Sequence, residues 1–267
     1  MKELVAAVDL GPGVRAGFTT RSGGVSAPPW DSLNLAGHVG DDPAAVAANR
    51  DAVAAWLGVP VAYATQVHGA HVRCVAGPPP PGTLSVGEAD ALVTTSTQVG
   101  LGVLVADCAP VLLADPQAGV VAAAHAGRPG LVAGVVQATV AAMRDLGAQV
   151  DRVVAVVGPC VAGRSYEVPA SLRDDVAAAV PGTGCVTDWG TPGVDVAAGV
   201  RGVLAGLGVR RVEVVGTDTY HEGSLFSYRR DGPVTGRFAG LVRLLGPGAL
   251  GGSPPSRLRG TIAATMP

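Results

Sequence analysis

The sequence predicts a mixed α/β fold in which helices cover a mostly antiparallel or mixed sheet. Apolar residues make up 48 % of the 267 residues, which is enough for a substantial core in one domain spanning residues 1–267. Apolar strand-like runs alternate only in part with helical segments. Runs at 100–106, 111–115 and 119–124 follow one another without a helix, which predicts an antiparallel meander. These runs are apolar almost throughout, so we expect both faces of the sheet to be covered.

The segment before this meander contains one well-delimited helix. Asp42 is a typical N-cap, Pro43 suits the first helical turn, and Gly58 suits the C-terminal cap. The other expected elements here are a strand at 14–20, a polar turn at 21–24 and a strand-like run at 61–75 that is interrupted at His68 and Gly69.

The segment after the meander is predicted to alternate between helices and strands. Gly147 is expected to close a helix, and Gly208 another. The expected elements are helices at 131–146, 171–180 and 195–207 and strands at 153–157 and 211–215. Residues 246–257 are rich in Gly, Pro and Ser, and we expect a loosely ordered loop there.

Charge and cysteine content exclude several classes of protein. The net charge is −2 and charged residues are only 15 % of the chain, so we expect no nucleic-acid partner, which would need a basic stripe. The uncharged run at 91–106 is too short and too polar to span a bilayer. No signal peptide is visible, and the four cysteines form no disulfide-scaffold pattern. We therefore expect a soluble cytoplasmic protein that does not bind membranes.

Three residues at the ends of strand-like runs form a candidate metal site: His68, Cys108 and His125. Two imidazoles and one thiolate are a plausible ligand set for Zn²⁺, and three protein ligands leave the fourth position open, as catalytic sites do. Cys108 leaves the first strand of the meander and His125 leaves the third, so both could lie along one sheet edge. Asp107 is a candidate acceptor that would fix an imidazole.

Other interpretations use nearly the same residues. His71 is a rival ligand, although it would face away from His68 on an uninterrupted strand. Cys108 with His125 and Asp107 could instead form a metal-free Cys-His-acid site of a hydrolase. Each of these residues taken alone is more often a packing or surface residue than a ligand.

Arginines offer a second chemistry, the binding of an anion. The guanidinium group suits phosphate or carboxylate, and the candidates are Arg21, Arg50, Arg229, Arg230 and Arg237. Solvated surface charge is the better interpretation for any one of them. The segment 227–232 is expected to contain an internal Arg–Asp pair and a turn.

At these residues the chain resembles the YfiH-type family, first described as laccase-domain or multicopper polyphenol oxidases and now understood as purine nucleoside phosphorylases. The order and spacing of the matching motifs agree over nearly the whole chain. They are Thr20–Ser26, Leu33–Leu35, His38–Asp42, Asn49–Arg50, Gln66–Gly69, Glu88–Thr94, Ala106–Val111, His125–Gly127, Gly158–Pro159, Tyr166–Val168 and Phe226–Gly232.

The resemblance implies a compact α/β sandwich with two related sheet-and-helix halves and a catalytic zinc site at His68, Cys108 and His125. It implies phosphorolysis of adenosine, inosine, guanosine and methylthioadenosine by inorganic phosphate, with adenosine deamination as a second activity. Arg50 is the implied phosphate ligand, and we expect Asn34 and Arg128 to bind substrate as well.

The chain departs from the family pattern in two places. Arg128-Pro129-Gly130 stands where the family usually has Trp-Arg-Gly, and we expect Arg128 to replace the displaced arginine. Asp218-Thr219 stands where the family often has Cys-Thr. The first departure leaves open a non-catalytic, partner-binding domain. The older family description leaves open a copper-dependent phenol oxidase, although five His and three Met are few for a multicopper site.

Overall fold

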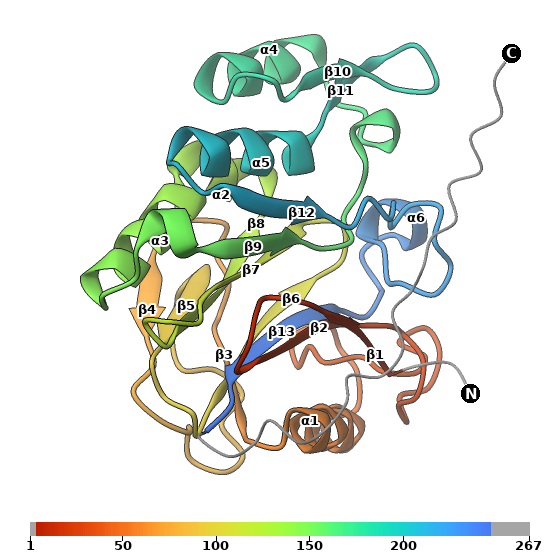
Figure 1. The fold of residues 1–267 in the computed structure, drawn as a ribbon. Coiled ribbons are helices and arrows are strands. Elements are labelled where there is room, and N and C mark those ends of the chain that lie inside the picture. Colours follow the sequence, from red (N-terminus) through yellow and green to blue (C-terminus); the bar gives the residue numbers. More distant parts are fainter. Residues whose placement is uncertain (1–3, 247–267) are drawn as a thin grey trace, which may run out of the picture.

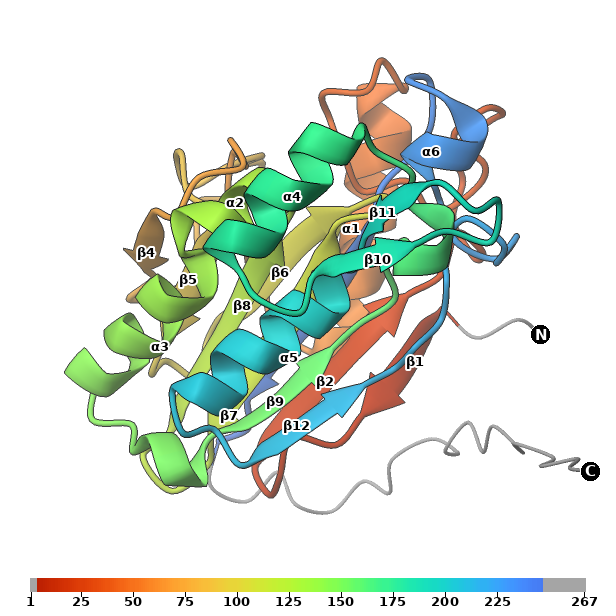
Figure 2. The ribbon, with the colours of Figure 1, turned by 90° about the horizontal axis from the view of Figure 1, so that it is seen from above.

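The computed structural model describes residues 4–246 and has the predicted α/β class, with helices covering two mixed sheets. Figures 1 and 2 show these sheets stacked face to face, with helix α1 outside one sheet and helices α2, α3 and α5 outside the other. Helix α4 and the β10–β11 hairpin lie farther out, beyond α5. The expected loop at 246–257 lies outside the described residues apart from Gly246.

The first sheet has five strands in the order β1-β2-β13-β6-β3, and only the β3–β6 pair is parallel. Helix α1 covers its outer face, with Asp42 accepting a hydrogen bond from the Ala44 N–H and Gly58 in the left-handed conformation, as predicted. The bounds are β1 Val5–Val8, β2 Val14–Thr19, α1 Pro43–Leu57, β3 Val61–Tyr63, β6 Gly100–Val105 and β13 Phe238–Leu244.

The second sheet has six strands in the order β12-β9-β7-β8-β5-β4, with parallel pairs at both edges. The strands are β4 Val72–Cys74, β5 Ala91–Thr94, β7 Ala109–Asp115, β8 Val120–Ala126, β9 Val154–Val157 and β12 Arg211–Val214. The helices are α2 Arg128–Ala133, α3 Val135–Asp145, α4 Ala170–Ala179, α5 Val196–Gly206 and α6 Tyr228–Asp231, with 3-10 turns at Val150–Arg152 and Gly163–Ser165. A small hairpin pairs β10 Gly184–Val186 with β11 Pro192–Val194.

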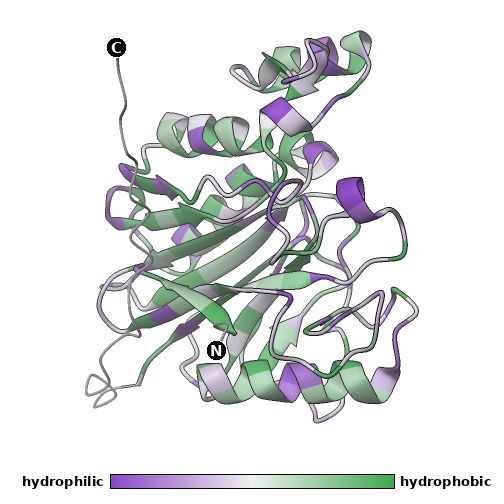
Figure 3. Ribbon diagram, turned by 90° about the vertical axis from the view of Figure 1, so that its right-hand side faces the viewer, coloured by the Kyte–Doolittle hydropathy of each residue, from purple (hydrophilic) through white to green (hydrophobic). Residues whose placement is uncertain are grey.

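Stacking of the two sheets explains why the central strands are apolar throughout. In β8, Ala122 and Ala124 pack toward the helices, whereas Val121 and Ala123 pack toward the other sheet. Both faces of such a strand are buried, so the usual alternation of polar and apolar residues disappears. The central strands are correspondingly hydrophobic in Figure 3.

The predicted three-strand meander is wrong, because its first strand belongs to the other sheet. β6 pairs with β13 and β3, and only β7 and β8 pair with each other. Asp107, with φ of 92°, lies in the turn where the chain passes between the sheets. A strand buried on both faces carries no pattern that tells which sheet it joins.

Two further predictions need correction. The run at 61–75 forms two short strands, β3 and β4, in different sheets, so His68 lies on the connection between the sheets and not at a strand end. The single helix expected at 131–146 is split into α2 and α3 at Gly134, whose φ of 91° is incompatible with a continuous helix. Strands β1, β5, β10, β11 and β13 were not among the predicted elements.

No helix within residues 4–246 is both long enough and apolar enough to cross a lipid bilayer.

Candidate metal centre

His68, Cys108 and His125, the trio, meet where the two sheets adjoin. One side-chain ligand atom from each residue lies within 4.8 Å of those of the other two. The Sγ atom of Cys108 is 3.7 Å from Nε2 of His68, and the two imidazole rings are 4.7 Å apart in an edge-to-face arrangement. The structure therefore brings together three side chains that are far apart in the sequence.

Each of these residues comes from a different structural element. His68 lies on the connection from β3 to β4 with φ of 59°, Cys108 lies in the turn between β6 and β7, and His125 is the penultimate residue of β8. Residue 110 of β7 pairs with His125 across the ladder, which places the start of β7 beside the end of β8. The predicted proximity is thus achieved at a junction of two sheets and not along a single sheet edge.

Gly127 leaves the space that the trio needs. A Cβ atom at this position would lie 2.7 Å from Cδ2 of His68 and 3.0 Å from Sγ of Cys108. Real Cβ atoms essentially never approach another atom as closely as the first of these distances. The absence of a side chain at residue 127 therefore allows both groups to approach the end of β8.

The donor set fits a zinc ion. Zn–S and Zn–N bonds of about 2.3 and 2.05 Å in tetrahedral geometry place sulfur and nitrogen about 3.6 Å apart, close to the observed separation. His125 is buried, but His68 is exposed to solvent, so the site is open on the His68 side. A three-ligand site that is accessible to solvent has room for a substrate or water at a fourth position.

A buried carboxylate, Asp90, holds both imidazole-bearing segments. Its Oδ1 accepts a hydrogen bond from Nδ1 of His125 at 2.9 Å and from the backbone N–H of His68 at 2.8 Å. This is the acceptor role that the sequence assigned to Asp107, and that assignment is wrong. The signal for Asp90 was present in the motif at 88–94, but nothing in the sequence places this carboxylate beside His125.

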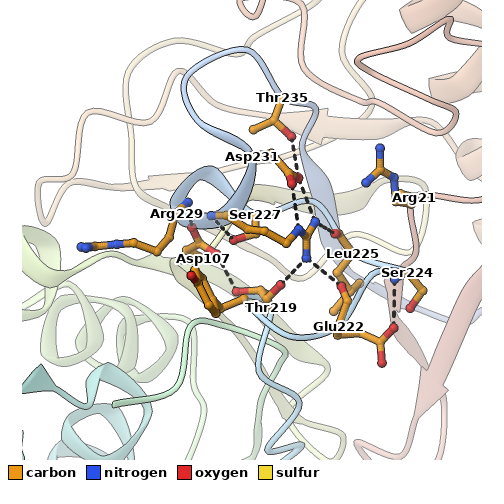
Figure 4. A network of polar contacts seen from close by, with 12 residues as sticks. Arg21, Asp107, Thr219, Glu222, Ser224, Leu225, Ser227, Arg229, Asp231 and Thr235 are labelled. Atoms are coloured by element: carbon orange, nitrogen blue, oxygen red, sulfur yellow. Dashed lines mark hydrogen bonds and ion pairs between the residues drawn. The ribbon is translucent and has the colours of Figure 1, made fainter. Parts of the chain in front are cut away.

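Asp107 instead connects the turn that contains Cys108 to the segment at residues 219–231 (Figure 4). Its carboxylate accepts hydrogen bonds of 2.6 Å from the Thr219 hydroxyl and from the Arg229 N–H. Arg230 reinforces the same segment by bonding to Asp231 and to backbone carbonyls of residues 219, 222 and 225. The internal Arg–Asp pair predicted in residues 227–232 is therefore confirmed.

Electrostatics in the trio favour an ionised thiolate. Burial opposes ionisation of Cys108, but the charge of His125 and hydrogen bonds from both imidazoles outweigh it and lower the pKa of the thiol. Burial likewise opposes a charged His125, but the thiolate and the Asp90 carboxylate raise its pKa. Burial also acts against ionisation of Asp90, yet the hydrogen bonds that it accepts lower its pKa. The thiolate is the form of cysteine that binds metal ions or acts as a nucleophile.

Two arginines, Arg50 and Arg237, form a positive cluster around His38. Burial lowers the pKa of Arg237, and the charges of Cys108 and Asp107 oppose that shift, so this guanidinium lies within electrostatic reach of the trio. Burial and the charges of Arg237 and Arg50 together lower the pKa of His38. Arg237 is one of several candidate anion-binding arginines in the sequence, and only the structure places it within reach of the trio and His38 beside it.

Of the predicted substrate residues, Arg50 belongs to this cluster and Asn34 bonds to the backbone of Arg237. Arg50 donates hydrogen bonds to the carbonyls of Leu35 and Leu84, and its guanidinium lies 4.4 Å from the centre of the Tyr63 ring. Asn34 is fully buried, and its amide bonds to Ala36, Asp41 and the N–H of Arg237. Within the described contacts, Asn34 positions the backbone of Arg237.

Arg128 and His71 lie differently with respect to the trio. Arg128 follows Gly127 directly, and its buried Nε has no hydrogen-bond partner. His71, the rival ligand, is outside the trio, and its Nδ1 lies 2.8 Å from the carbonyl of Glu88. Of these two side chains, only Arg128 has an unsatisfied buried donor.

Comparison with known proteins assigns a family. The model of the family described as multi-copper polyphenol oxidoreductase laccase matches residues 15–245. A protein of Streptomyces griseus named purine nucleoside phosphorylase is 55 % identical over 230 residues, which are 85 % of this chain and 93 % of that protein. A Streptomyces coelicolor protein of the same name is 52 % identical over 90 % of this chain and 100 % of its own length.

Solved structures agree with the sequence relatives. A Neisseria meningitidis protein superposes with a TM-score of 0.81 at 36 % identity, covering 91 % of this chain and all of its own. The YfiH protein of Bacillus licheniformis superposes with a TM-score of 0.77 at 29 % identity, covering 86 % of this chain and 92 % of its own. With its trio at the junction of two stacked sheets, the chain belongs to the laccase-like family that includes YfiH and relatives named purine nucleoside phosphorylase.

Proposed function

We propose that this protein is a zinc-dependent purine nucleoside phosphorylase that acts on adenosine, inosine, guanosine and methylthioadenosine and also deaminates adenosine. The convergence of the trio within 4.8 Å is the observation that carries the proposal. The names of relatives at 55 % and 52 % identity supply the reaction class. The proposed substrates are therefore purine nucleosides and inorganic phosphate.

The proposed metal is zinc and not copper. When bound, Zn²⁺ supplies a Lewis acid at the open position of the site. A blue-copper site would add a weak axial methionine to its His and Cys ligands, but the methionine within residues 4–246, Met143, lies in the core between the second sheet and its covering helices. A multicopper site would need further histidines, and the described residues contain a single metal-type group, the trio.

The positive cluster supports a phosphate-binding role beside the trio. Phosphorolysis joins a phosphate oxygen to the anomeric carbon of the sugar while the bond from that carbon to the purine nitrogen breaks. Arg237 and Arg50 would hold the phosphate anion, since guanidinium groups form paired hydrogen bonds with phosphate. His38, whose pKa is lowered, would be a neutral hydrogen-bonding neighbour. Asn34 would contribute by holding the backbone of Arg237.

Arg128 is the proposed replacement for the arginine that the family usually has one position later. Its buried Nε lacks a partner, and an unsatisfied buried donor costs stability unless a ligand or water satisfies it. A bound anionic or carbonyl oxygen would satisfy it. This supports Arg128 as a substrate residue.

Product analysis tests the phosphorylase activity. Purified protein incubated with inosine and phosphate should release hypoxanthine and ribose 1-phosphate, and the reaction should stop when phosphate is omitted. His125→Ala should be inactive, whereas Cys74→Ser should be active because Cys74 is exposed and outside the trio. Zinc-loaded, folded protein that gives no product with any of the four nucleosides would overturn the proposal.

A separate assay tests the deaminase activity. Adenosine without phosphate should give inosine and ammonia in a one-to-one ratio, and His125→Ala should abolish both. Adenine appearing only when phosphate is present, with no ammonia under either condition, would restrict the protein to phosphorolysis.

A Cys-His hydrolase is the second candidate, and the chain of contacts Cys108–His125–Asp90 favours it. An imidazole between a thiolate and a carboxylate is the arrangement of cysteine-dependent acyl transfer. Asp90 takes the place of the acid that the sequence assigned to Asp107. Ester hydrolysis that persists in metal-free protein and disappears in Cys108→Ser would favour this reaction over the zinc enzyme.

A further inference from the structure

Four N–H groups converge on the carboxylate of Asp90, a residue that is 1 % exposed and directly precedes β5. Oδ1 accepts from the His68 N–H at 2.8 Å and from Nδ1 of His125 at 2.9 Å. Oδ2 accepts from the N–H of Gly69 at 2.7 Å and from that of Val67 at 3.3 Å. Both oxygens therefore carry two donors, and three of the four donors belong to consecutive residues around His68.

We infer that Asp90 is a positioning residue that sets the geometry of both histidines of the trio at once. The inference rests on the proposed metal site. It adds a residue that touches neither the metal nor the substrate and acts through His68 and His125. Such outer carboxylates fix the orientation and proton position of ligating imidazoles, and their removal weakens metal binding.

The contact with His125 decides which ring nitrogen is free. A carboxylate can only accept a hydrogen bond, so Nδ1 of His125 must carry the proton. Nε2 is then the nitrogen whose lone pair is directed toward the rest of the trio. A backbone hydrogen bond joins the same two residues, since the His125 N–H donates to the carbonyl oxygen of Asp90 at 2.7 Å.

The contact with residues 67–69 holds His68 in an unfavourable backbone conformation. The φ of His68 is 59°, in the left-handed region that non-glycine residues adopt infrequently. Such a conformation persists only where surrounding contacts enforce it. The three N–H groups that bind Asp90 provide this enforcement and keep the exposed imidazole of His68 beside Cys108.

An asparagine at position 90 cannot reproduce both attachments. Its amide has one oxygen that accepts and one nitrogen that only donates. If the nitrogen replaces Oδ2, it faces the N–H groups of Val67 and Gly69. If it replaces Oδ1, it faces the His68 N–H and favours the His125 tautomer with the proton on Nε2. Either orientation disturbs one of the two histidines.

The test is the zinc affinity of Asp90→Asn, measured by competition with a chromophoric chelator on the full-length chain. The dissociation constant should rise about 10–100-fold, the range for outer-shell substitutions. Asp115→Asn is the matched control, because Asp115 is also buried and accepts N–H groups of residues 117, 118 and 149. Cys108 directly precedes β7, and Asp115 is the last residue of this strand. The length of the strand, about 20 Å, therefore separates Asp115 from the trio. Substitution of Asp115 should lower thermal stability and leave the zinc affinity unchanged.

The outcomes separate this inference from the proposed metal site. A wild-type protein that binds no zinc defeats the proposed site itself. A wild-type protein that binds zinc, together with folded Asp90→Asn of equal affinity, overturns the role of Asp90. Equal weakening in Asp90→Asn and Asp115→Asn would also overturn it, because the effect would then follow general destabilisation.

A measurement on the wild-type chain covers the case in which Asp90→Asn does not fold. Nitrogen-15 NMR of the zinc-loaded protein should show the His125 proton on Nδ1. A proton on Nε2 would refute the inference without any substitution.

Asp90→Glu keeps both carboxylate oxygens but moves them farther along the side chain. This variant should fold and bind zinc more weakly than the wild-type chain. Wild-type affinity in that variant would count against the role.

Discussion

The Sγ atom of Cys108 lies 3.7 Å from Nε2 of His68, although 40 residues separate them in the sequence. The connection between β3 and β4 carries one group, and the turn between β6 and β7 carries the other. Both segments cross from the first sheet to the second. The proposed metal site therefore occupies a place where the chain repeatedly changes sheets.

Removal of a proposed ligand should remove the metal. We expect Cys108→Ser to lose most of the bound zinc, because a serine hydroxyl is a much weaker zinc ligand than a thiolate. Metal analysis of purified protein measures this directly. Cys74→Ser should keep full zinc content, since Cys74 is exposed and lies outside the trio. Full zinc content in Cys108→Ser would assign the metal to other residues.

The thiol of Cys108 should be reactive at neutral pH when the protein is free of metal. Its pKa is lowered to about 6, so the thiolate predominates at pH 7 and diminishes as the pH falls through that value. After chelator treatment, iodoacetamide should alkylate Cys108 faster than Cys74 at pH 7, and the rate should fall below about pH 6. Added Zn²⁺ should protect Cys108. Peptide mass spectrometry after timed quenching identifies the site, and equal rates at Cys108 and Cys74 would contradict an ionised thiol.

Gly127 should be intolerant of a side chain for reasons of site geometry. A Cβ atom there would lie 2.7 Å from the His68 ring, so Gly127→Ala should displace a ligand and weaken zinc affinity by about tenfold or more. Chelator competition measures the change. Gly77→Ala is the control, because a Cβ at Gly77 has no neighbour within 4 Å and should have no effect on zinc. Unchanged affinity in Gly127→Ala would mean that the trio adjusts freely.

Gly134 should matter for stability and not for metal binding. Its φ of 91° separates α2 from α3, and alanine is disfavoured in the left-handed region by about 1–2 kcal/mol. Urea denaturation should show that Gly134→Ala lowers the free energy of unfolding by this amount. Gly206→Ala, at the end of α5 with ordinary helical backbone and open space around it, should be neutral or slightly stabilising. Equal effects in both variants would contradict the conformational explanation.

Arg237 should control the use of phosphate. Loss of a charged hydrogen-bond donor costs about 1.5–3 kcal/mol, so Arg237→Gln should raise the KM for phosphate about 10–100-fold. The KM for inosine should change little. Arg243→Gln is the control, because Arg243 lies near the other end of β13 and bonds to carbonyls of residues 57, 97 and 244. An equal rise in both KM values for Arg237→Gln would indicate a distorted site in place of a phosphate contact.

Local chemistry made several elements readable from the sequence. Asp42, Pro43 and Gly58 delimit α1 because capping depends on residues within one turn. The continuous apolar runs of β7 and β8 correctly indicated strands covered on both faces. The residue types of the trio predict a metal site, and the structure brings their ligand atoms within 4.8 Å of one another.

Sheet membership and the partners of the trio depended on tertiary structure. A strand that is buried on both faces has no pattern that identifies its neighbours, so the sequence predicts the wrong sheet for β6. A glycine inside a helical segment does not reveal its φ, so the sequence predicts no helix break at Gly134. Asp107 adjoins Cys108 in sequence, yet its carboxylate bonds to Thr219 and Arg229. Asp90 reaches His125 from 35 residues away because β5 and β8 are paired neighbours. The sequence determined which chemical groups are present, and the long-range pairing of strands decided which of them touch, because contact between distant segments depends on packing of the whole chain.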